Sequence, residues 1–475
     1  MNEPTRARRL SEVARVVDVE PLRWGDPRYV NLSEGRGLRN ELDLLKRRLF
    51  QHDARDNRYA KIAFTGTRGG GKTTELLRLE QQVSDRFTPL HVYVDESLYT
   101  DCGFAELFLW IVDELVQKFE RDKTPLDARL VEQVARWFFD VSVEQTDKVV
   151  SEITAEAEAK VGGKASLFWL SLGLFARLKS QIKGSTDRRE IIRGKLQQRE
   201  SDLVSHVNEL LDNAQGVLTK HGKPADLLIV VDNLDRLDPE VSRPLFFESG
   251  DTLKQPKAHF IYTVPSAIDL APINIGTVFG DKFTLSTVKV RGQNGRAIKK
   301  GIDALEQLVA ERIDVDAVFA KPRDVRKLAE MSGGSLRDLM RLLLNAQLLA
   351  LADERETIES THVKEAVDRL RLDYEKSLFP GWAYYPILAR IHRSKSELGE
   401  SSDVADPEKA TQYCTVFSKL LFSSSVLAYN GEDVWYDVHP VIQEIDAFKD
   451  AFERAKSDAQ AASRPETGEG QARRE

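Results

Sequence analysis

The stretch Gly66-Thr67-Arg68-Gly69-Gly70-Gly71-Lys72-Thr73 decides the fold of this chain. It fits G-x-x-x-x-G-K-[ST], the pattern of a phosphate-binding P-loop. The residues before it, 61–65, are typical of a short buried strand, and those after it, 74–79, of the start of a helix. A loop between a strand and a helix N-terminus gathers backbone N–H groups and the positive end of the helix dipole around one point. The sequence therefore predicts a nucleotide phosphate site here.

The residue types of this loop assign roles within the predicted site. Lys72 is expected to reach the β- and γ-phosphates, and the Thr73 hydroxyl to take one position on Mg²⁺. Glycines allow the backbone to curl around a phosphate without Cβ clashes. The predicted nucleotide contacts in this stretch are Gly66, Thr67, Arg68, Gly69, Gly70, Gly71, Lys72, Thr73 and Thr74.

Length and composition bound the class of protein. With 475 residues, 41% of them hydrophobic and 31% charged, the chain is typical of a globular protein with two or three domains. Its longest apolar run, 167–176, is about half a bilayer span, so it predicts a buried helix and no membrane partner. Two distant cysteines, Cys102 and Cys414, favour a reducing cytoplasm. A net charge of -7 argues against a chain that mainly coats nucleic acid.

Apolar strands alternate with helical patterns, which predicts an α/β fold with a parallel sheet covered on both faces. We expect a P-loop NTPase domain with a helical insert near 124–220, followed by a helical region and a C-terminal hairpin. The hairpin is predicted from two short strands, 426–429 and 434–438, around an Asn430-Gly431 turn. The expected strands of the sheet are 61–65, 90–95, 226–232, 259–264 and 283–290.

Composition shifts along the chain predict its domain boundaries. The expected parts are an N-terminal segment 1–25, a P-loop ATPase domain 26–299, a helical region 300–375, a region with the hairpin 376–450 and a disordered tail 451–475. The tail is expected to be disordered because it is mostly Ala, Ser, Gly and charge.

Five apolar residues lead into Asp232, as a Walker B strand requires. At the carboxyl edge of the sheet its carboxylate is expected to hold Mg²⁺ through water. Asp235, three residues later, is expected either to orient or deprotonate the attacking water or to cap a helix. Asn233 occupies the place where many ring-forming ATPases carry a glutamate, which argues against fast hydrolysis.

Two further residues are candidates for the catalytic set. Thr263 ends the fourth strand, which is expected beside the strand of Asp232, so its hydroxyl is a candidate contact for the γ-phosphate or the attacking water. Arg337 follows Gly333-Gly334 at the start of a predicted helix, from which a guanidinium can reach a nucleotide phosphate. The structural alternatives are an ordinary strand-end threonine and an exposed helical arginine.

Taken together, the P-loop, the Walker B strand, Thr263 and the Gly-x-x-Arg of 334–337 resemble an AAA+-type P-loop ATPase. The resemblance covers roughly 26–445 and is greatest to the origin-recognition and STAND side of that superfamily. It implies that 300–375 is a helical lid and that 376–450, with the hairpin and its flanking helices, is a winged-helix-like domain. It implies ATP or ADP with Mg²⁺ as ligands, an ATPase activity, and Val30 and Asn31 among the nucleotide-binding residues. No arginine stands just before the fifth strand, where ring ATPases carry an arginine finger; Lys282 is the nearest cation.

One motif favours the STAND side of this resemblance. Residues 436–441, Tyr-Asp-Val-His-Pro-Val, resemble the MHD motif, in which a winged-helix histidine contacts the β-phosphate of ADP. His439 would have that role here, although Pro440 replaces the aspartate of the motif. The structural alternative is a histidine that closes a β-hairpin.

The function implied by this resemblance is a slowly hydrolysing ATP-dependent molecular switch that signals to a separate effector or sensor protein. Homo-oligomers and a role in bacterial anti-phage defence are further implications of the resemblance. The main alternative is a nucleic-acid-binding loader similar to origin-recognition ATPases. Mixed charges over 394–409, five of them acidic, weigh against a DNA-recognition face there. A nucleotide-binding scaffold with little turnover is the remaining alternative.

Overall fold

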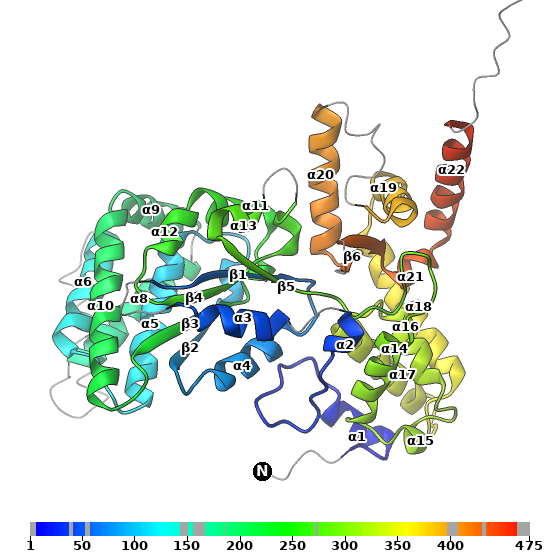
Figure 1. Cartoon of the computed structure of the whole chain (residues 1–475), viewed down its shortest axis with the longest axis horizontal. Coiled ribbons are helices and arrows are strands. Elements are labelled where there is room, and N and C mark those ends of the chain that lie inside the picture. Colours follow the sequence, from blue (N-terminus) through cyan, green and yellow to red (C-terminus); the bar gives the residue numbers. More distant parts are fainter. Residues whose placement is uncertain are drawn as a thin grey trace, which may run out of the picture. The chain divides into compact units, whose positions relative to one another are not determined.

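The computed structural model describes residues 6–37, 41–52, 58–142, 151–153, 155, 167–184, 186–270, 274–396, 407–429 and 434–462. The chain forms two compact units (Figure 1). The P-loop unit comprises 21–24 and 40–285, and the lid unit comprises 1–20, 25–39 and 286–475.

The P-loop unit is built on a five-stranded sheet in the order β2-β3-β4-β1-β5, in which every pairing is parallel. The second and fifth strands begin and end earlier than the sequence pattern predicted, because Phe87–Pro89 pair with β3 and the β5 ladder ends at Leu285. The predicted order, with the strand of Thr263 beside that of Asp232, is confirmed. The strands are β1 (Lys61–Gly66), β2 (Phe87–Tyr93), β3 (Asp226–Asp232), β4 (His259–Thr263) and β5 (Asp281–Leu285).

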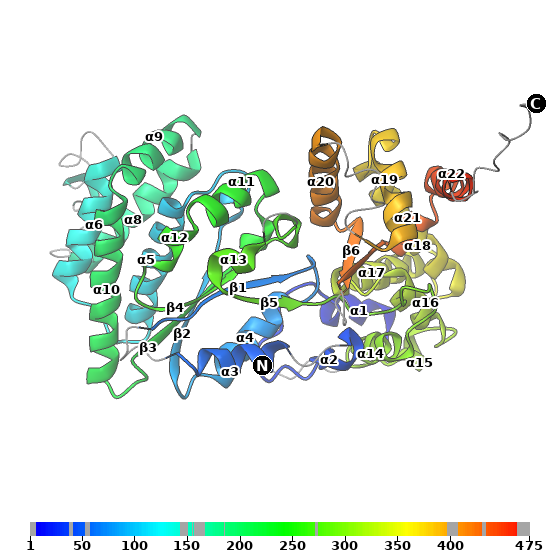
Figure 2. The ribbon, with the colours of Figure 1, turned by 45° about the horizontal axis from the view of Figure 1, so that its top comes forward.

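Side chains alternate across this sheet and fill two cores. In β3, Leu228 and Val230 pack with α3 (Glu41–Leu49) and α4 (Lys72–Gln82) on one face. Leu227, Ile229 and Val231 belong to the core on the other face, with the helices that include α5 (Phe104–Arg121) and α10 (Glu200–Lys220). Figure 2 shows α3 and α4 on one side of the strands and α11–α13 on the other. This double cover confirms the predicted α/β fold class.

The predicted insert between β2 and β3 is helical in its described residues. After α5 it contains α6 (Ala128–Ser142), α8 (Leu167–Gly184), α9 (Thr186–Gln197) and α10. The apolar run at 167–176 lies in α8, where Leu174 and Phe175 are buried. The shorter helices of the P-loop unit are η2 (Glu96–Leu98), η3 (Leu234–Arg236), α11 (Pro239–Arg243), η4 (Pro244–Glu248), α12 (Gly250–Lys254), η5 (Ser266–Ile268) and α13 (Ile275–Phe279).

The lid unit is mostly helical and contains a two-stranded antiparallel hairpin, β6 (Val426–Tyr429) with β7 (Trp435–Val438). The predicted Asn430-Gly431 turn lies outside the described residues. The helices of the unit are α1 (Leu10–Val16), α2 (Ser33–Arg36), α14 (Lys299–Ala310), α15 (Val315–Val318), α16 (Asp324–Met331), α17 (Leu336–Ala352), α18 (Ser360–Ser377), α19 (Gly381–Ser394), α20 (Pro407–Phe422), α21 (Pro440–Gln443) and α22 (Asp446–Ala462).

The structure moves two predicted boundaries. Residues 1–20 and the lead-in, 25–39, belong to the lid unit: Ala7 pairs with Ile313, and the Lys289 N–H donates to the Gly35 carbonyl at 2.9 Å. Tight packing explains the second contact, because a Cβ on Gly35 would lie 3.2 Å from Ala304. A chain that pairs in this way is part of the lid, so neither 1–25 as a separate segment nor 26–299 as the ATPase domain is right.

The predicted disordered tail is also wrong over its first residues. Helix α22 continues to Ala462. Its aromatic side chains anchor it, because the rings of Phe448 and Phe452 lie 5.8 and 4.8 Å from that of His392 in α19. Residues 463–475 lie outside the described part of the chain. Both cysteines are free, and no described helix has the length and apolar character to cross a bilayer.

Candidate functional site: the P-loop and the Walker B carboxylates

The P-loop turns away from β1 in a conformation that its glycines permit. Gly69 and Gly71 have φ of 77° and 92°, in the left-handed region that favours glycine. Gly66 has φ of 149°, and a Cβ there would lie 2.5 Å from the Leu285 carbonyl of neighbouring β5. The sequence thus folds into a tight loop that ends where Lys72 begins α4.

Lys72 is buried, with 5% of its side chain exposed, and its ammonium is directed at three oxygens. It donates to the carbonyls of Gly66 at 2.8 Å and Thr67 at 2.9 Å. It also pairs with Asp235 Oδ2 at 2.8 Å. The structure therefore brings the predicted P-loop lysine and the second predicted carboxylate together.

Asp235 lies in η3, which follows the Walker B strand. The helix-capping alternative for Asp235 is not what the structure shows, because α11 is capped by Asp238, whose side chain accepts from the Glu240 N–H. Asn233 has φ of 69°, a left-handed conformation that asparagine tolerates better than most side chains. This turn directs the chain so that Asp235 faces Lys72.

Asp232 ends β3 and is 1% exposed. Burial raises the pKa of its carboxyl, but hydrogen bonds with His91 and Thr73 outweigh burial, so the pKa lies below the ordinary value. Its Oδ1 accepts from the Asn233 N–H at 2.7 Å. Thr73, the predicted partner of Asp232 in metal binding, is therefore at its side.

His91 is the site residue that the sequence analysis missed. Its ring in β2 lies between two carboxylates, with Nδ1 2.6 Å from Glu80 Oε1 and Nε2 3.4 Å from Asp232 Oδ2. Burial lowers the pKa of His91, but these two carboxylates outweigh it and raise the pKa to about 9. The Tyr93 ring lies 4.3 Å from the imidazole. One signal in the sequence could have identified His91. It is a polar residue between the apolar Leu90 and Val92, both buried, and it lies two positions before the strand ends.

Thr263 is fully buried, and its hydroxyl is used within the protein. It accepts from the Leu234 N–H at 3.1 Å and donates to the Val231 carbonyl at 3.3 Å. These bonds fix the start of η3 against β4. The structure thus gives Thr263 a role in positioning the Walker B loop, instead of the expected contact with phosphate or water.

The remaining loop residues surround this cluster. Thr67 is buried, whereas Arg68 and Thr74 are half-buried. The Thr74 hydroxyl accepts from the Leu22 N–H at 3.2 Å, which ties the segment before the lead-in to the P-loop helix. The predicted nucleotide contacts of 66–74 therefore lie together, as the motif requires.

Four predicted site residues lie in the lid unit: Val30, Asn31, Arg337 and His439. Val30 is buried there, and the Asn31 side chain accepts from the Ser33 N–H and hydroxyl. Arg337 is half-buried in the first turn of α17, whose cap is Ser335.

His439 is fully buried, and this overturns its predicted contact with a nucleotide. Its Nδ1 accepts from the Val441 N–H at 3.4 Å, and its Nε2 lies 3.4 Å from Asp338 Oδ2. The Tyr374 ring stacks on it at 4.7 Å. Both ring nitrogens thus face protein groups, and His439 joins the hairpin to helices α17 and α18 within the lid unit. It has the structural role that was the alternative.

Comparison with protein families matches residues 57–262 to the KAP family P-loop domain. The match includes the P-loop, the Walker B strand and the insert between them, and it confirms the P-loop NTPase domain predicted from the sequence. No curated protein matches the chain.

The solved structures that align with most of the chain share little sequence with it and have TM-scores below 0.5. The Aeropyrum pernix ORC2 protein, solved in ADPNP–ADP complexes, is 14% identical over 94% of this chain and 98% of its own, with a TM-score of 0.41. The Walker-type ATPase PABY2304 of Pyrococcus abyssi is 11% identical over 91% and 99%, with a TM-score of 0.42. Drosophila ORC bound to DNA is 12% identical over 96% and 93%, with a TM-score of 0.38.

Proposed function

We propose that this protein is a Mg²⁺-dependent ATPase that works as a molecular switch. The observation that carries the proposal is the cluster at the end of β1 and β3. There the P-loop ammonium of Lys72 lies 2.8 Å from the carboxylate of Asp235, beside the buried Asp232 and Thr73. A cation, two carboxylates and a hydroxyl at a glycine-rich helix N-terminus are the groups that phosphoryl transfer requires.

The residues present fit a nucleotide phosphate. The glycine turn leaves backbone N–H groups at the N-terminus of α4, where an anion is stabilised by the helix dipole. A Cβ at Gly70 would lie 3.0 Å from the Thr67 carbonyl, so side chains are kept out of the curl of the loop. Lys72 adds the one mobile positive charge to these fixed donors.

The donor set also fits Mg²⁺. Asp232 and Thr73 offer hard oxygen atoms, and Asp232 Oδ2 is buried without a well-aligned hydrogen bond. Mg²⁺ in such sites keeps several waters and takes only one or two protein oxygens besides phosphate. When bound, the metal supplies positive charge to the phosphate oxygens. His91 and the Asn233 N–H hold the Asp232 carboxylate in place for it.

The Lys72–Asp235 pair suggests how phosphate and catalysis are linked. Lys72 already donates to two carbonyls and lies beside the Asp235 carboxylate, so a phosphate that binds its ammonium must compete with one of these three neighbours. Gly66 and Thr67 offer neutral carbonyls, whereas Asp235 repels a phosphate. We therefore expect phosphate binding to release the Asp235 carboxylate, which then orients or deprotonates the attacking water. Asp235 would then act as a base only when ATP is bound, because only then does its carboxylate leave Lys72.

The switch would act through the lid unit and a separate effector or sensor protein, by a change that depends on the γ-phosphate. This part of the proposal, like a role in anti-phage defence, rests on the resemblance to STAND proteins. The genes that neighbour its coding gene would test it, because a nuclease or another toxic effector is expected beside a defence switch.

The catalytic part can be tested with the full chain. ATP affinity is measured by calorimetry. ATP turnover is measured as the rate of phosphate release at several Mg²⁺ concentrations. We expect micromolar binding and slow, Mg²⁺-dependent turnover, which Lys72→Ala reduces and Lys220→Ala, at an exposed lysine of α10, does not. Binding without any turnover would leave the scaffold alternative, and a folded chain that binds no ATP would contradict the proposal.

One feature of the lid unit favours a second function, binding of nucleic acid. The segment 286–302 contains five cations and no carboxylate. Its loop is held by the Ile298 N–H to the Val290 carbonyl and the Gly292 N–H to the Arg296 carbonyl, both at 2.9 Å. Arg296, Lys299 and Lys300 are exposed on it. The cations of the segment are Lys289, Arg291, Arg296, Lys299 and Lys300.

Such a surface suits a phosphate backbone, and affinity should then fall steeply with salt. Binding of a labelled DNA duplex is measured over a salt series for the wild type and for the triple variant Arg296→Glu, Lys299→Glu, Lys300→Glu. Salt-sensitive binding that the triple variant loses would favour the loader alternative. Equal, weak binding by both proteins would exclude this surface.

A further inference from the structure

The loop between β2 and α5, residues 94–103, lies between the helical insert and the Walker B loop of the P-loop unit. On its Walker B side, the Val94 N–H donates to the Asp232 carbonyl at 3.1 Å. The Tyr99 carbonyl accepts from the Asp238 N–H at 2.9 Å, and the Tyr99 hydroxyl lies 3.4 Å from the Arg236 guanidinium. The β2–α5 loop is thus bonded to the residues on both sides of Asp235.

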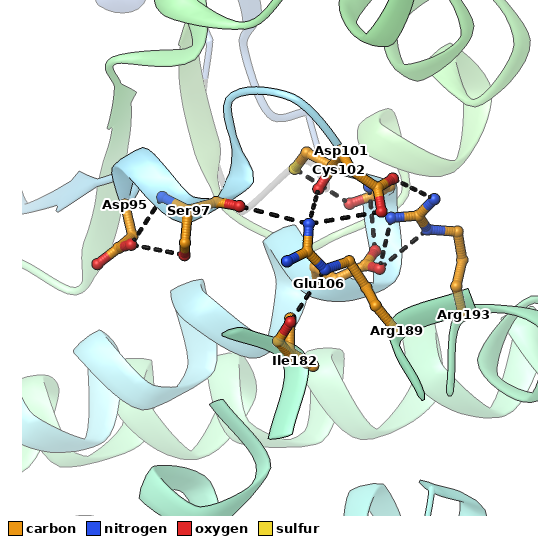
Figure 3. Close-up of polar contacts among 9 residues, drawn as sticks. Asp95, Ser97, Asp101, Cys102, Glu106, Ile182, Arg189 and Arg193 are labelled. Carbon is orange, nitrogen blue, oxygen red and sulfur yellow. Dashed lines mark hydrogen bonds and ion pairs between the residues drawn. The ribbon is translucent and has the colours of Figure 1, made fainter. Parts of the chain in front are cut away.

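On its other side, the same loop is held by two arginines of α9. Arg189 donates to the carbonyls of Ser97 and Asp101 at 3.3 and 3.2 Å, and to Ile182 of α8 at 2.9 Å. Its side chain is only 8% exposed. A buried guanidinium that bonds backbone carbonyls of two segments fixes their separation, and Figure 3 shows it between the β2–α5 loop and α8.

Arg193, one turn later, completes this contact. It pairs with Asp101 Oδ1 at 2.6 Å and with Glu106 Oε1 at 2.9 Å (Figure 3). Glu106 has no exposed surface, and its other oxygen accepts from the Gly103 N–H at 3.0 Å at the start of α5. Paired arginine and carboxylate groups with this degree of burial allow few alternative arrangements. The insert therefore holds the β2–α5 loop at Ser97 and at Asp101.

From these contacts we propose that the helical insert controls the nucleotide site, with Arg189 and Arg193 as positioning residues. They fix the β2–α5 loop, and through Tyr99 that loop fixes the Walker B segment 232–238. The inference rests on the proposed ATPase function. It makes the insert the place where a partner acts: whatever loosens α9 from the loop also displaces Asp235 from Lys72. Because linkage is reciprocal, nucleotide binding must in turn change how firmly α9 is held.

The first experiment measures ATP turnover of the full chain with Arg193→Ala and with Asp101→Asn. The second variant removes the short ion pair but leaves Glu106 paired, so it tests the inference even where Arg193→Ala does not fold. We expect kcat to fall about tenfold in both variants while KM changes little. The reason is that Asp232 and Asp235 are still present but are displaced from their positions beside the P-loop. Arg193→Lys should recover part of the loss.

The matched control is Lys179→Ala. Lys179 of α8 pairs with Asp113 of α5 at 2.6 Å, so it also docks the insert on the sheet but does not touch the β2–α5 loop. We expect wild-type kcat for this variant. If Lys179→Ala lowers kcat as much as Arg193→Ala, general packing of the insert is responsible and the inference is overturned.

The second experiment measures hydrogen exchange of α9 and of residues 94–103, with and without AMP-PNP and Mg²⁺. We expect nucleotide to slow exchange in both segments of the wild type and of Lys179→Ala, and in neither segment of Asp101→Asn. If Asp101→Asn keeps both wild-type kcat and the nucleotide-dependent protection, the inference is wrong. If the wild type binds AMP-PNP but hydrolyses no ATP, only the proposed hydrolysis fails, and the exchange data alone decide the coupling.

Discussion

Each unit of the molecule contains a buried histidine whose Nε2 lies 3.4 Å from an aspartate Oδ2: His91 with Asp232 in the P-loop unit, and His439 with Asp338 in the lid unit. In both pairs the pKa of the aspartate lies below its ordinary value although burial raises it. The surroundings separate them. Asp232 has Thr73 and the P-loop beside it, whereas Asp338 accepts from the Tyr374 hydroxyl at 3.1 Å.

This difference shows that a histidine–aspartate contact does not by itself indicate a nucleotide site. In the lid unit every neighbour of the pair is a side chain or backbone group that the pair holds in place. In the P-loop unit the pair leaves carboxylate oxygen available beside a hydroxyl and an ammonium. We therefore expect variants of the first pair to change catalysis and variants of the second to change stability.

The largest expected effect is that of Lys72→Ala. Removing the ammonium that faces the phosphate should lower kcat/KM for ATP about 10³-fold, as expected for the loss of a preorganised charge on the transition state. The chain should remain folded by circular dichroism, with Lys220→Ala as the matched lysine control. Wild-type turnover by folded Lys72→Ala would contradict the assigned site.

Asp235→Asn separates catalysis from binding. The amide cannot take a proton from water, so kcat should fall on the order of 10²-fold. ATP affinity should be equal or tighter, because the competing negative charge on Lys72 is gone. Single-turnover kinetics and calorimetry measure the two quantities. Unchanged kcat would show that Asp235 only neutralises Lys72.

The lid pair should affect pH stability instead. Burial raises the pKa of Asp338, but the contact with His439 outweighs it and lowers the pKa to about 2. A depressed pKa stabilises the fold above the unfolded value near 3.9, and this contribution is lost as the pH falls from about 4 to 2. The free energy of unfolding should therefore lose about 2 kcal/mol more in the wild type than in Asp338→Asn over that range. Equal losses in urea titrations would contradict this.

The smallest effect expected is that of His91→Ala. Without the imidazole, the Asp232 carboxylate keeps its charge but loses one of the groups that orient it, so kcat should fall about tenfold and more Mg²⁺ should be needed for half-maximal rate. His91→Gln should recover part of the loss. Thr88→Ala, near the other end of the same strand, serves as the control. A Mg²⁺ requirement that stays at the wild-type value would show that His91 does not act on Asp232.

Much of the P-loop unit could be predicted from sequence because its signals are local. The eight residues of the loop, the apolar run into Asp232 and the strand that ends in Thr263 each specify their own backbone. The predicted meeting of Lys72 with the Walker B segment then followed from parallel topology. The helical insert was also recognisable, because more residues separate Lys72 from Asp232 in the sequence than a P-loop core needs.

The misses were contacts between distant segments. Nothing near His439 in the sequence indicates that Asp338 and Tyr374 will enclose it. The resemblance to the MHD motif therefore gave the wrong partner. The lead-in was assigned to the ATPase domain because its contact with the lid cannot be seen in the local sequence. Gly35 and Lys289, which form that contact, are over 250 residues apart in the chain. His91 was overlooked because its two carboxylates, Glu80 and Asp232, come from a helix and another strand.

The most direct test of the account compares Asp232→Asn with Asp338→Asn in one set of assays, Mg²⁺-dependent ATP turnover and thermal unfolding. The account predicts that Asp232→Asn abolishes turnover in a chain that stays folded. Asp338→Asn should keep most of the turnover but unfold several degrees lower, as expected for a loss of about 2 kcal/mol. Wild-type turnover by Asp232→Asn, or its loss in a stable Asp338→Asn, would contradict the assignment of the catalytic site.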